Sequence, residues 1–174
     1  MQQKLPVEIE PLRLARQKQT LAGVLNIAAL KRLCLDLADD AGEVNVQLEF
    51  GFDASNKPYV VGQFNAEVVL TCERCMEAMP FHIQVNNMMG IVKHEHQIDD
   101  IPESYEPWLI GEDGPVFLAD MIEEELILAL PLVAKHESAC IPAEAWQTAA
   151  VAEIEDEGAR ESSPFDVLAS LKSK

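Results

Sequence analysis

Hydrophobic and polar residues alternate through the middle of the chain. From Val44 to Phe50 every second residue is apolar, residues 59–71 form a long apolar-rich segment, and alternation resumes at 81–92. Side chains of a strand point alternately to opposite faces, so a period of two is typical of half-buried strands. Turn-forming residues at 53–58 separate the first two segments. The pattern therefore predicts three successive strands in an antiparallel meander.

Helical spacing is expected on both sides of these strands. Asn26 is suited to cap a helix over 27–38, and a second helix is predicted over 118–130, where Pro131 would end it. Further predictions are a short strand at 5–9, a helix at 12–19, a short apolar segment at 20–24 and a long ordered loop at 94–114. Together these elements predict an α+β fold, an antiparallel sheet over about 43–92 flanked by helices.

The composition changes after Cys140. Residues 142–163 are rich in alanine and glutamate with little hydrophobic pattern, which predicts a flexible acidic linker. Ser163 and Pro164 form a helix start, followed by apolar residues every third position at Phe165, Leu168 and Leu171. We expect one α+β domain at 1–141, the linker at 142–163 and a helical docking peptide at 164–174. The peptide either packs back on the domain or binds a partner's groove.

Charge is distributed unevenly along the 174 residues. The net charge is −17, but residues 1–35 carry a net +4 and residues 93–163 a net −15. Because nucleic-acid affinity rests largely on phosphate contacts, the acidic body should repel RNA. Arg13, Arg16 and Lys18 are therefore the predicted contacts with RNA or a partner. Two alternatives remain: the acidic half attracts a basic protein, or the acidity only confers solubility.

Targeting segments and enzyme motifs are not evident. The longest apolar stretch, 126–134, is interrupted by Pro131 and too short to span a membrane, and the N-terminus lacks the apolar core of a signal peptide. Four scattered cysteines do not suggest a secreted disulfide framework. No phosphate-binding loop or nucleophile elbow is recognisable. We expect a cytoplasmic protein that is not an enzyme, with no membrane partner and no small-molecule substrate.

Two separated pairs of residues could hold a metal ion. Cys72 and Cys75 lie in a turn between two predicted strands, and His136 and Cys140 follow the predicted stop of the second helix. C-x2-C with H-x3-C is an acceptable ligand set for a structural zinc. A redox C-x2-C is disfavoured because no helix can begin at the cysteines before Pro80. The alternative is a hairpin turn with two ordinary thiols and a surface histidine.

Several segments resemble the YceD family of bacterial proteins. The matching segments are Cys72-Glu73-Arg74-Cys75, 104–107, 123–131 and 163–172. The resemblance covers nearly the whole chain. It implies a role in the synthesis, processing or stability of large-subunit (23S) rRNA, as an assembly accessory factor without catalytic residues. Many family members carry more cysteines after the equivalent of Pro131, whereas this chain has His136 and Cys140.

Three functions therefore remain to be distinguished. The first is a non-catalytic ribosome-biogenesis factor that binds large-subunit rRNA or its precursor particle, directly or through a basic ribosomal protein. The second is an acidic chaperone for a basic ribosomal protein, which the charge of residues 93–163 favours. The third is a zinc-dependent or redox protein, for which only the cysteines argue.

Overall fold

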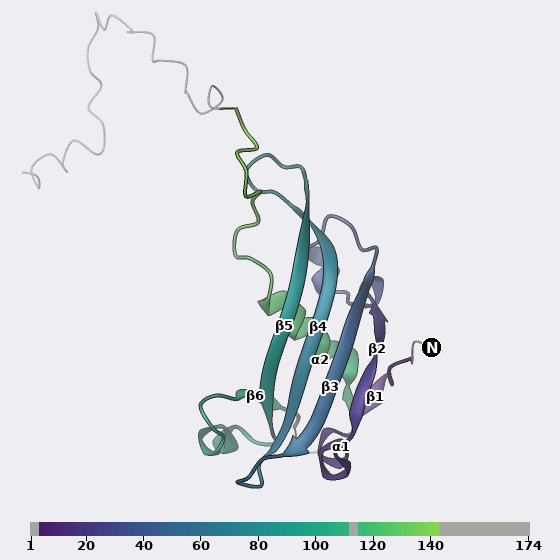
Figure 1. Ribbon diagram of the computed structural model, residues 1–174, viewed down its shortest axis with the longest axis vertical. Coiled ribbons are helices and arrows are strands. Elements are labelled where there is room, and N and C mark those ends of the chain that lie inside the picture. The colour runs from purple at the N-terminus through teal and green to yellow at the C-terminus, as the bar shows by residue number, and fades with distance from the viewer. Residues whose placement is uncertain (1–3, 112–114, 143–174) are drawn as a thin grey trace, which may run out of the picture. The chain divides into compact units, whose positions relative to one another are not determined.

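The computed structural model describes residues 4–111 and 115–142, and those up to Cys140 belong to one compact unit. A five-stranded sheet with strand order β2-β3-β4-β5-β6 forms the centre of this unit (Figure 1). Its strands are β2 (Thr20–Asn26), β3 (Glu43–Phe52), β4 (Pro58–Thr71), β5 (Ala78–Val92) and β6 (Glu106–Leu109). The first four pair antiparallel in chain order. The predicted α+β fold with an antiparallel meander is confirmed.

Helices and a small second ladder complete the described part. Strand β1 (Glu8–Ile9) pairs antiparallel with β7 (Val116–Phe117). The α-helices are α1 (Pro11–Gln17) and α2 (Leu118–Leu128), and the 3-10 turns are η1 (Ile27–Ala29), η2 (Leu33–Leu35) and η3 (Glu95–Asp100). The helix predicted over 118–130 is thus confirmed, with its end two residues earlier.

The core lies between one face of the sheet and α2. The inward positions of three strands are in register, since Val46 pairs with Phe64 and Phe64 with Val85. Helix α2 crosses behind the sheet in Figure 1 and contributes Leu118, Ile122 and Leu126 to the buried core. Each fully buried side chain of this kind stabilises the fold by about 1.5–3 kcal/mol. The sheet and α2 therefore form a rigid base for the loops at the ends of the strands.

The helix predicted over 27–38 is wrong. Asn26 does cap the segment, since its Oδ1 accepts a hydrogen bond from the Ala28 N–H at 2.9 Å. The chain then forms only the short turns η1 and η2, which bury Ile27, Leu30 and Leu33 at a spacing of three. The Ala38 N–H next donates to the Val69 carbonyl oxygen at 2.7 Å. Tertiary contacts of this kind outweigh helix propensity, which is worth only tenths of a kcal/mol per residue.

The loop predicted at 94–114 contains regular structure. It includes η3 and the edge strand β6, which pairs parallel with β5 through Met89–Glu106 to Val92–Leu109. Two prolines in the segment concealed this strand, because proline is uncommon in strands away from sheet edges. Trp108, on β6, packs against the hydrophobic core.

The predicted linker and docking peptide lie, apart from Pro142, outside the described residues. Phe165, Leu168 and Leu171 belong to that part of the chain. These expectations remain predictions.

Candidate metal centre

The loop between β4 and β5 positions the first pair of ligands. It is closed by hydrogen bonds from the Cys72 N–H to the Glu77 carbonyl oxygen at 2.9 Å and from the Met76 N–H to the Cys72 carbonyl oxygen at 2.7 Å. Met76 takes a left-handed conformation with φ of 62°. This tight turn brings the Cys72 and Cys75 thiols to the same side of the hairpin tip.

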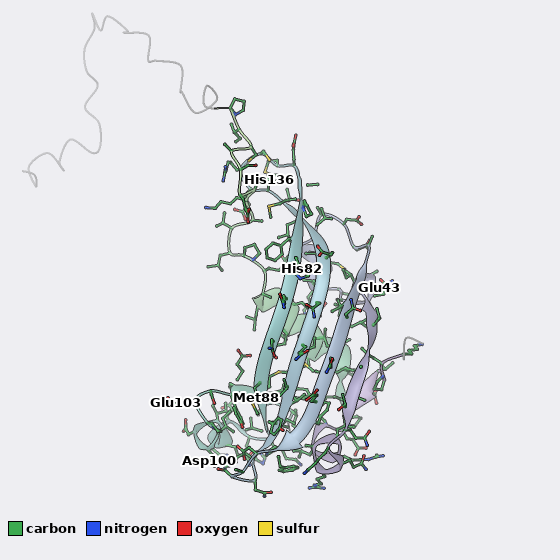
Figure 2. The ribbon with its side chains drawn as sticks, in the orientation of Figure 1. Glu43, His82, Met88, Asp100, Glu103 and His136 are labelled. Atoms are coloured by element: carbon green, nitrogen blue, oxygen red, sulfur yellow. The ribbon has the colours of Figure 1, made fainter. Side chains whose placement is uncertain are left out.

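Hydrogen bonds from the hairpin loop hold the segment that carries the second pair. The Glu73 N–H donates to the Ala134 carbonyl oxygen at 2.8 Å. The Arg74 guanidinium donates to the carbonyl oxygens of Ser138 and His136, each at 3.3 Å. His136 accordingly lies beside the tip of the β4–β5 hairpin (Figure 2). The chain after α2 is thereby fixed against the hairpin although 61 residues separate Cys75 from His136.

The four predicted ligands form one cluster. One donor atom from each of Cys72, Cys75, His136 and Cys140 lies within 4.8 Å of the others, so the group could hold a metal ion. The Cys72 and Cys140 sulfurs are 3.9 Å apart, and the Cys75 sulfur is 3.5 Å from His136 Nδ1. Tetrahedral zinc with bonds of about 2.3 Å to sulfur and 2.0–2.1 Å to nitrogen requires separations of roughly 3.8 and 3.6 Å. The donor types and their spacing both fit zinc.

The electrostatic surroundings favour a thiolate in the cluster. Burial of Cys72 opposes ionisation, but hydrogen bonds from the backbone of Cys75, His136 and Arg74 lower the pKa of this thiol to about 6. Burial and the neighbouring thiols Cys75 and Cys72 raise the pKa of Cys140. The backbone hydrogen bonds therefore favour the thiolate form of Cys72. A cysteine binds metal as its thiolate, so this is the state that a metal site needs.

The structure places two of the three predicted basic contact residues, Arg13 and Arg16, in one pocket. Arg13 and Arg16 line a pocket of about 270 Å³ together with Lys93, which follows β5. Arg13 also forms an ion pair with Glu10 at 3.5 Å. Lys18 caps the C-terminus of α1 with φ of 49° and does not line this pocket. The sequence pattern does not associate Lys93 with Arg13 and Arg16, because Lys93 is distant from them in sequence and lies among acidic residues.

Comparisons with known proteins identify relatives that match most or nearly all of the chain. The family model described as "Large ribosomal RNA subunit accumulation protein YceD" matches residues 60–172. The protein of that name from Haemophilus influenzae is 33% identical over 171 residues, covering 98% of each chain. No solved structure matches. Among the described residues, no helix has the length and apolar character that crossing a membrane requires. Because the family model matches well over half of the sequence and the relative nearly all of it, this chain belongs to the YceD family.

Proposed function

We propose that this protein is a non-catalytic, cytoplasmic factor that supports accumulation of large-subunit rRNA by binding to the rRNA, its precursor particle or a ribosomal protein. The observation that carries the proposal is the match to the relative named for this role, at 33% identity over 98% of both chains. A match over 98% of the chain spans the β4–β5 hairpin and the segment after α2. The role in the relative's name is therefore proposed for the whole chain rather than for one of its parts.

The proposal is tested in cells that lack the gene. We expect large-subunit rRNA to fall relative to small-subunit rRNA, and the large-subunit peak to shrink in sucrose-gradient sedimentation. A plasmid copy of the gene should restore both. Unchanged rRNA levels in the deletion strain would refute the proposal. The step affected, whether synthesis, processing or stability, is distinguished by the precursor ends and the half-life of the rRNA.

The metal centre has a structural role in this proposal, with zinc held by Cys72, Cys75, His136 and Cys140. The supporting observation is the pair of donor separations, 3.9 and 3.5 Å, which match tetrahedral zinc. Four protein ligands fill the tetrahedral shell and leave no position for the water that a catalytic zinc carries. Bound zinc would join the hairpin tip to the chain after α2 without adding chemistry.

Elemental analysis of protein purified in reducing buffer tests the zinc assignment. We expect about one zinc per chain in the wild type and a large loss in the Cys140→Ser variant. Cys34→Ser is the matched control, because that thiol lies outside the cluster and donates to the Ile27 carbonyl oxygen at 3.3 Å. Absence of stoichiometric zinc from the wild type, or equal zinc in both variants, would contradict a zinc site.

An acidic chaperone for a basic ribosomal protein is the second candidate. The observation that favours it is the net charge of −15 on residues 93–163. Affinity capture of the tagged protein with and without nuclease distinguishes the two. Recovery of one basic ribosomal protein after nuclease treatment favours the chaperone, whereas loss of all ribosomal components favours contact through RNA.

A further inference from the structure

Large apolar side chains are exposed together at the metal-centre end of the domain. Leu35 is 84% exposed, Met76 73%, and Leu132 fully exposed. These side chains come from η2, the hairpin loop and the segment after α2, yet all three line one groove of about 510 Å³. We name this the distal groove. Its floor adds Leu70, Ile127 and Leu130, among further residues. Contiguous apolar surface of this kind is typical of interaction sites.

The walls of the distal groove are fixed by hydrogen bonds. The bond from the Glu73 N–H to the Ala134 carbonyl oxygen joins two of its lining residues across the hairpin and the segment after α2. The Ala38 N–H donates to the Val69 carbonyl oxygen, which holds the chain after η2 against β4. The exposed leucine and methionine side chains therefore stand on a defined framework.

Met76 occupies an unusual backbone conformation for its side chain. Its φ of 62° lies in the left-handed region, where glycine, asparagine and aspartate are the common residues. Such a conformation costs of order 1–3 kcal/mol for a residue with a Cβ and persists mainly at functional sites. The turn thus presents a long, flexible apolar side chain at the lip of the groove, and methionine is a residue that adapts to varied binding partners.

The charge of the groove indicates the class of partner. Among the described residues that line it, Asp36 and Glu73 are the ionisable ones, and both are acidic. An apolar floor with an acidic rim repels the phosphates of RNA. It suits lysine or arginine side chains that flank large apolar side chains.

We propose that the distal groove binds a segment of a basic protein, in which large apolar side chains are interspersed among lysine or arginine residues. The apolar side chains fill the groove between Leu35, Met76 and Leu132. The basic residues pair with Asp36 and Glu73 on the rim. That the partner is a ribosomal protein rests on the proposed function; the chemistry of the groove does not depend on it.

The test measures fluorescence anisotropy of a labelled 15-residue peptide with leucine at every third or fourth position and lysine elsewhere. The full-length protein should bind it, and the Met76→Ser, Leu132→Ser double variant should bind at least tenfold more weakly. Leu109→Ser is the matched control, because that leucine is 47% exposed on β6 and does not line the groove. Glu73→Gln with Asp36→Asn should weaken binding and reduce its dependence on salt.

Three results would overturn the assignment. One is that the double variant binds the peptide as tightly as the wild type does, or that the wild type binds equally well a control peptide in which serine replaces every leucine. A second is that the protein binds single-stranded RNA more tightly than the peptide, and that Met76→Ser with Leu132→Ser abolishes this RNA binding. The third is peptide binding that is undetectable in the wild type and appears only when serine replaces Phe165, Leu168 and Leu171, which would show that the chain's own C-terminal segment occupies the groove. Normal rRNA levels in the deletion strain would instead refute the proposed function and leave the peptide result intact.

Discussion

Glu123 is the buried charged residue among those that the structure describes. Replacing it should cost more stability than replacing its exposed neighbour Glu124. Its Oε1 accepts hydrogen bonds from the backbone N–H groups of Arg32 at 2.7 Å and Leu33 at 3.2 Å, and its Oε2 accepts one from Arg32 Nε at 2.9 Å. The carboxylate thereby joins α2 to η2. Glu124 provides the contrast, because it is 57% exposed and bonds Arg32 Nη1 at 2.7 Å.

The expected costs of the two alanine variants differ. Glu123→Ala leaves the N–H of fully buried Leu33 without a partner, at about 1–3 kcal/mol, and removes a charge-assisted bond to Arg32, for a total of about 2–4 kcal/mol. Glu124→Ala removes an exposed ion pair worth about 0–1 kcal/mol. In urea unfolding, with a slope of about 2 kcal/mol/M, the first variant should lower the midpoint by roughly 1–2 M and the second by less than about 0.5 M.

The pH dependence of unfolding gives an independent check on Glu123. Burial acts to raise the pKa of this carboxyl, but the bonds from Arg32 and the Leu33 N–H outweigh it and lower the pKa. A lowered folded-state pKa contributes stability that is present above the ordinary glutamate pKa, about 4.3, and is lost as pH falls through the folded value. The difference in stability between wild type and Glu123→Gln should therefore narrow on acidification. Equal midpoint shifts for the Glu123 and Glu124 alanine variants, or a difference independent of pH, would refute this reasoning.

Three further variants test other charged groups. Burial, followed by the Glu106 charge, raises the pKa of Glu125, so its ionised form destabilises the fold as pH rises through that pKa. Glu125→Gln should therefore raise the thermal midpoint at pH 7 but not below pH about 4, in calorimetry; an equal gain at both pH values would contradict this. Arg13→Ala with Arg16→Ala should weaken association with a large-subunit rRNA fragment and reduce the slope of log affinity against log salt by about 1.4–1.8, whereas Lys18→Ala outside their pocket should have less effect. An unchanged slope in filter-binding measurements would show that these arginines do not contact phosphate.

The strands and the ligand pairs could be predicted because short-range sequence determines them. Alternation from Val44 to Phe50 matches the buried and exposed positions of β3 residue by residue. The spacing within each ligand pair identified all four members of the cluster, since two cysteines in one tight turn necessarily face the same region. The backbone bonds that position the second pair, from Glu73 and Arg74, carry no sequence signal. They depend on which carbonyl oxygens the fold brings near.

The failed predictions share one cause, which is contact across long stretches of sequence. The segment 27–38 has helical spacing, yet its N–H groups at Arg32 and Leu33 bind Glu123, some 90 residues away. Strand β6 depends on parallel pairing with β5, which local hydrophobic period does not reveal. The distal groove is formed by three segments that are distant in sequence, so the sequence pattern does not predict it either. Propensity and period describe one segment at a time, whereas these features depend on partners.

The long β4–β5 hairpin explains why a metal would matter at its tip. Pairing of β3 with β4 ends at Val44–Ala66, whereas pairing of β4 with β5 continues to Thr71–Ala78. Beyond Ala66, the described partner of β4 on its other side is the single bridge from Asp39 to Val69. A two-stranded hairpin is at best marginally stable in water. We therefore expect this overhang to depend on the core contacts of its inward side chains and on the cluster at its tip.

Removal of the proposed zinc should consequently loosen the overhang before the rest of the sheet. Hydrogen exchange followed by mass spectrometry, with and without a chelator, should show faster exchange in residues 67–82 and unchanged protection in 44–64. The metal-free Cys140→Ser variant should reproduce the chelator's effect without added chelator. Loss of protection across both ranges would show that the metal supports the whole domain. Unchanged exchange in 67–82 would show that hydrogen bonds alone, such as the one from the Glu73 N–H to Ala134, hold the tip in place.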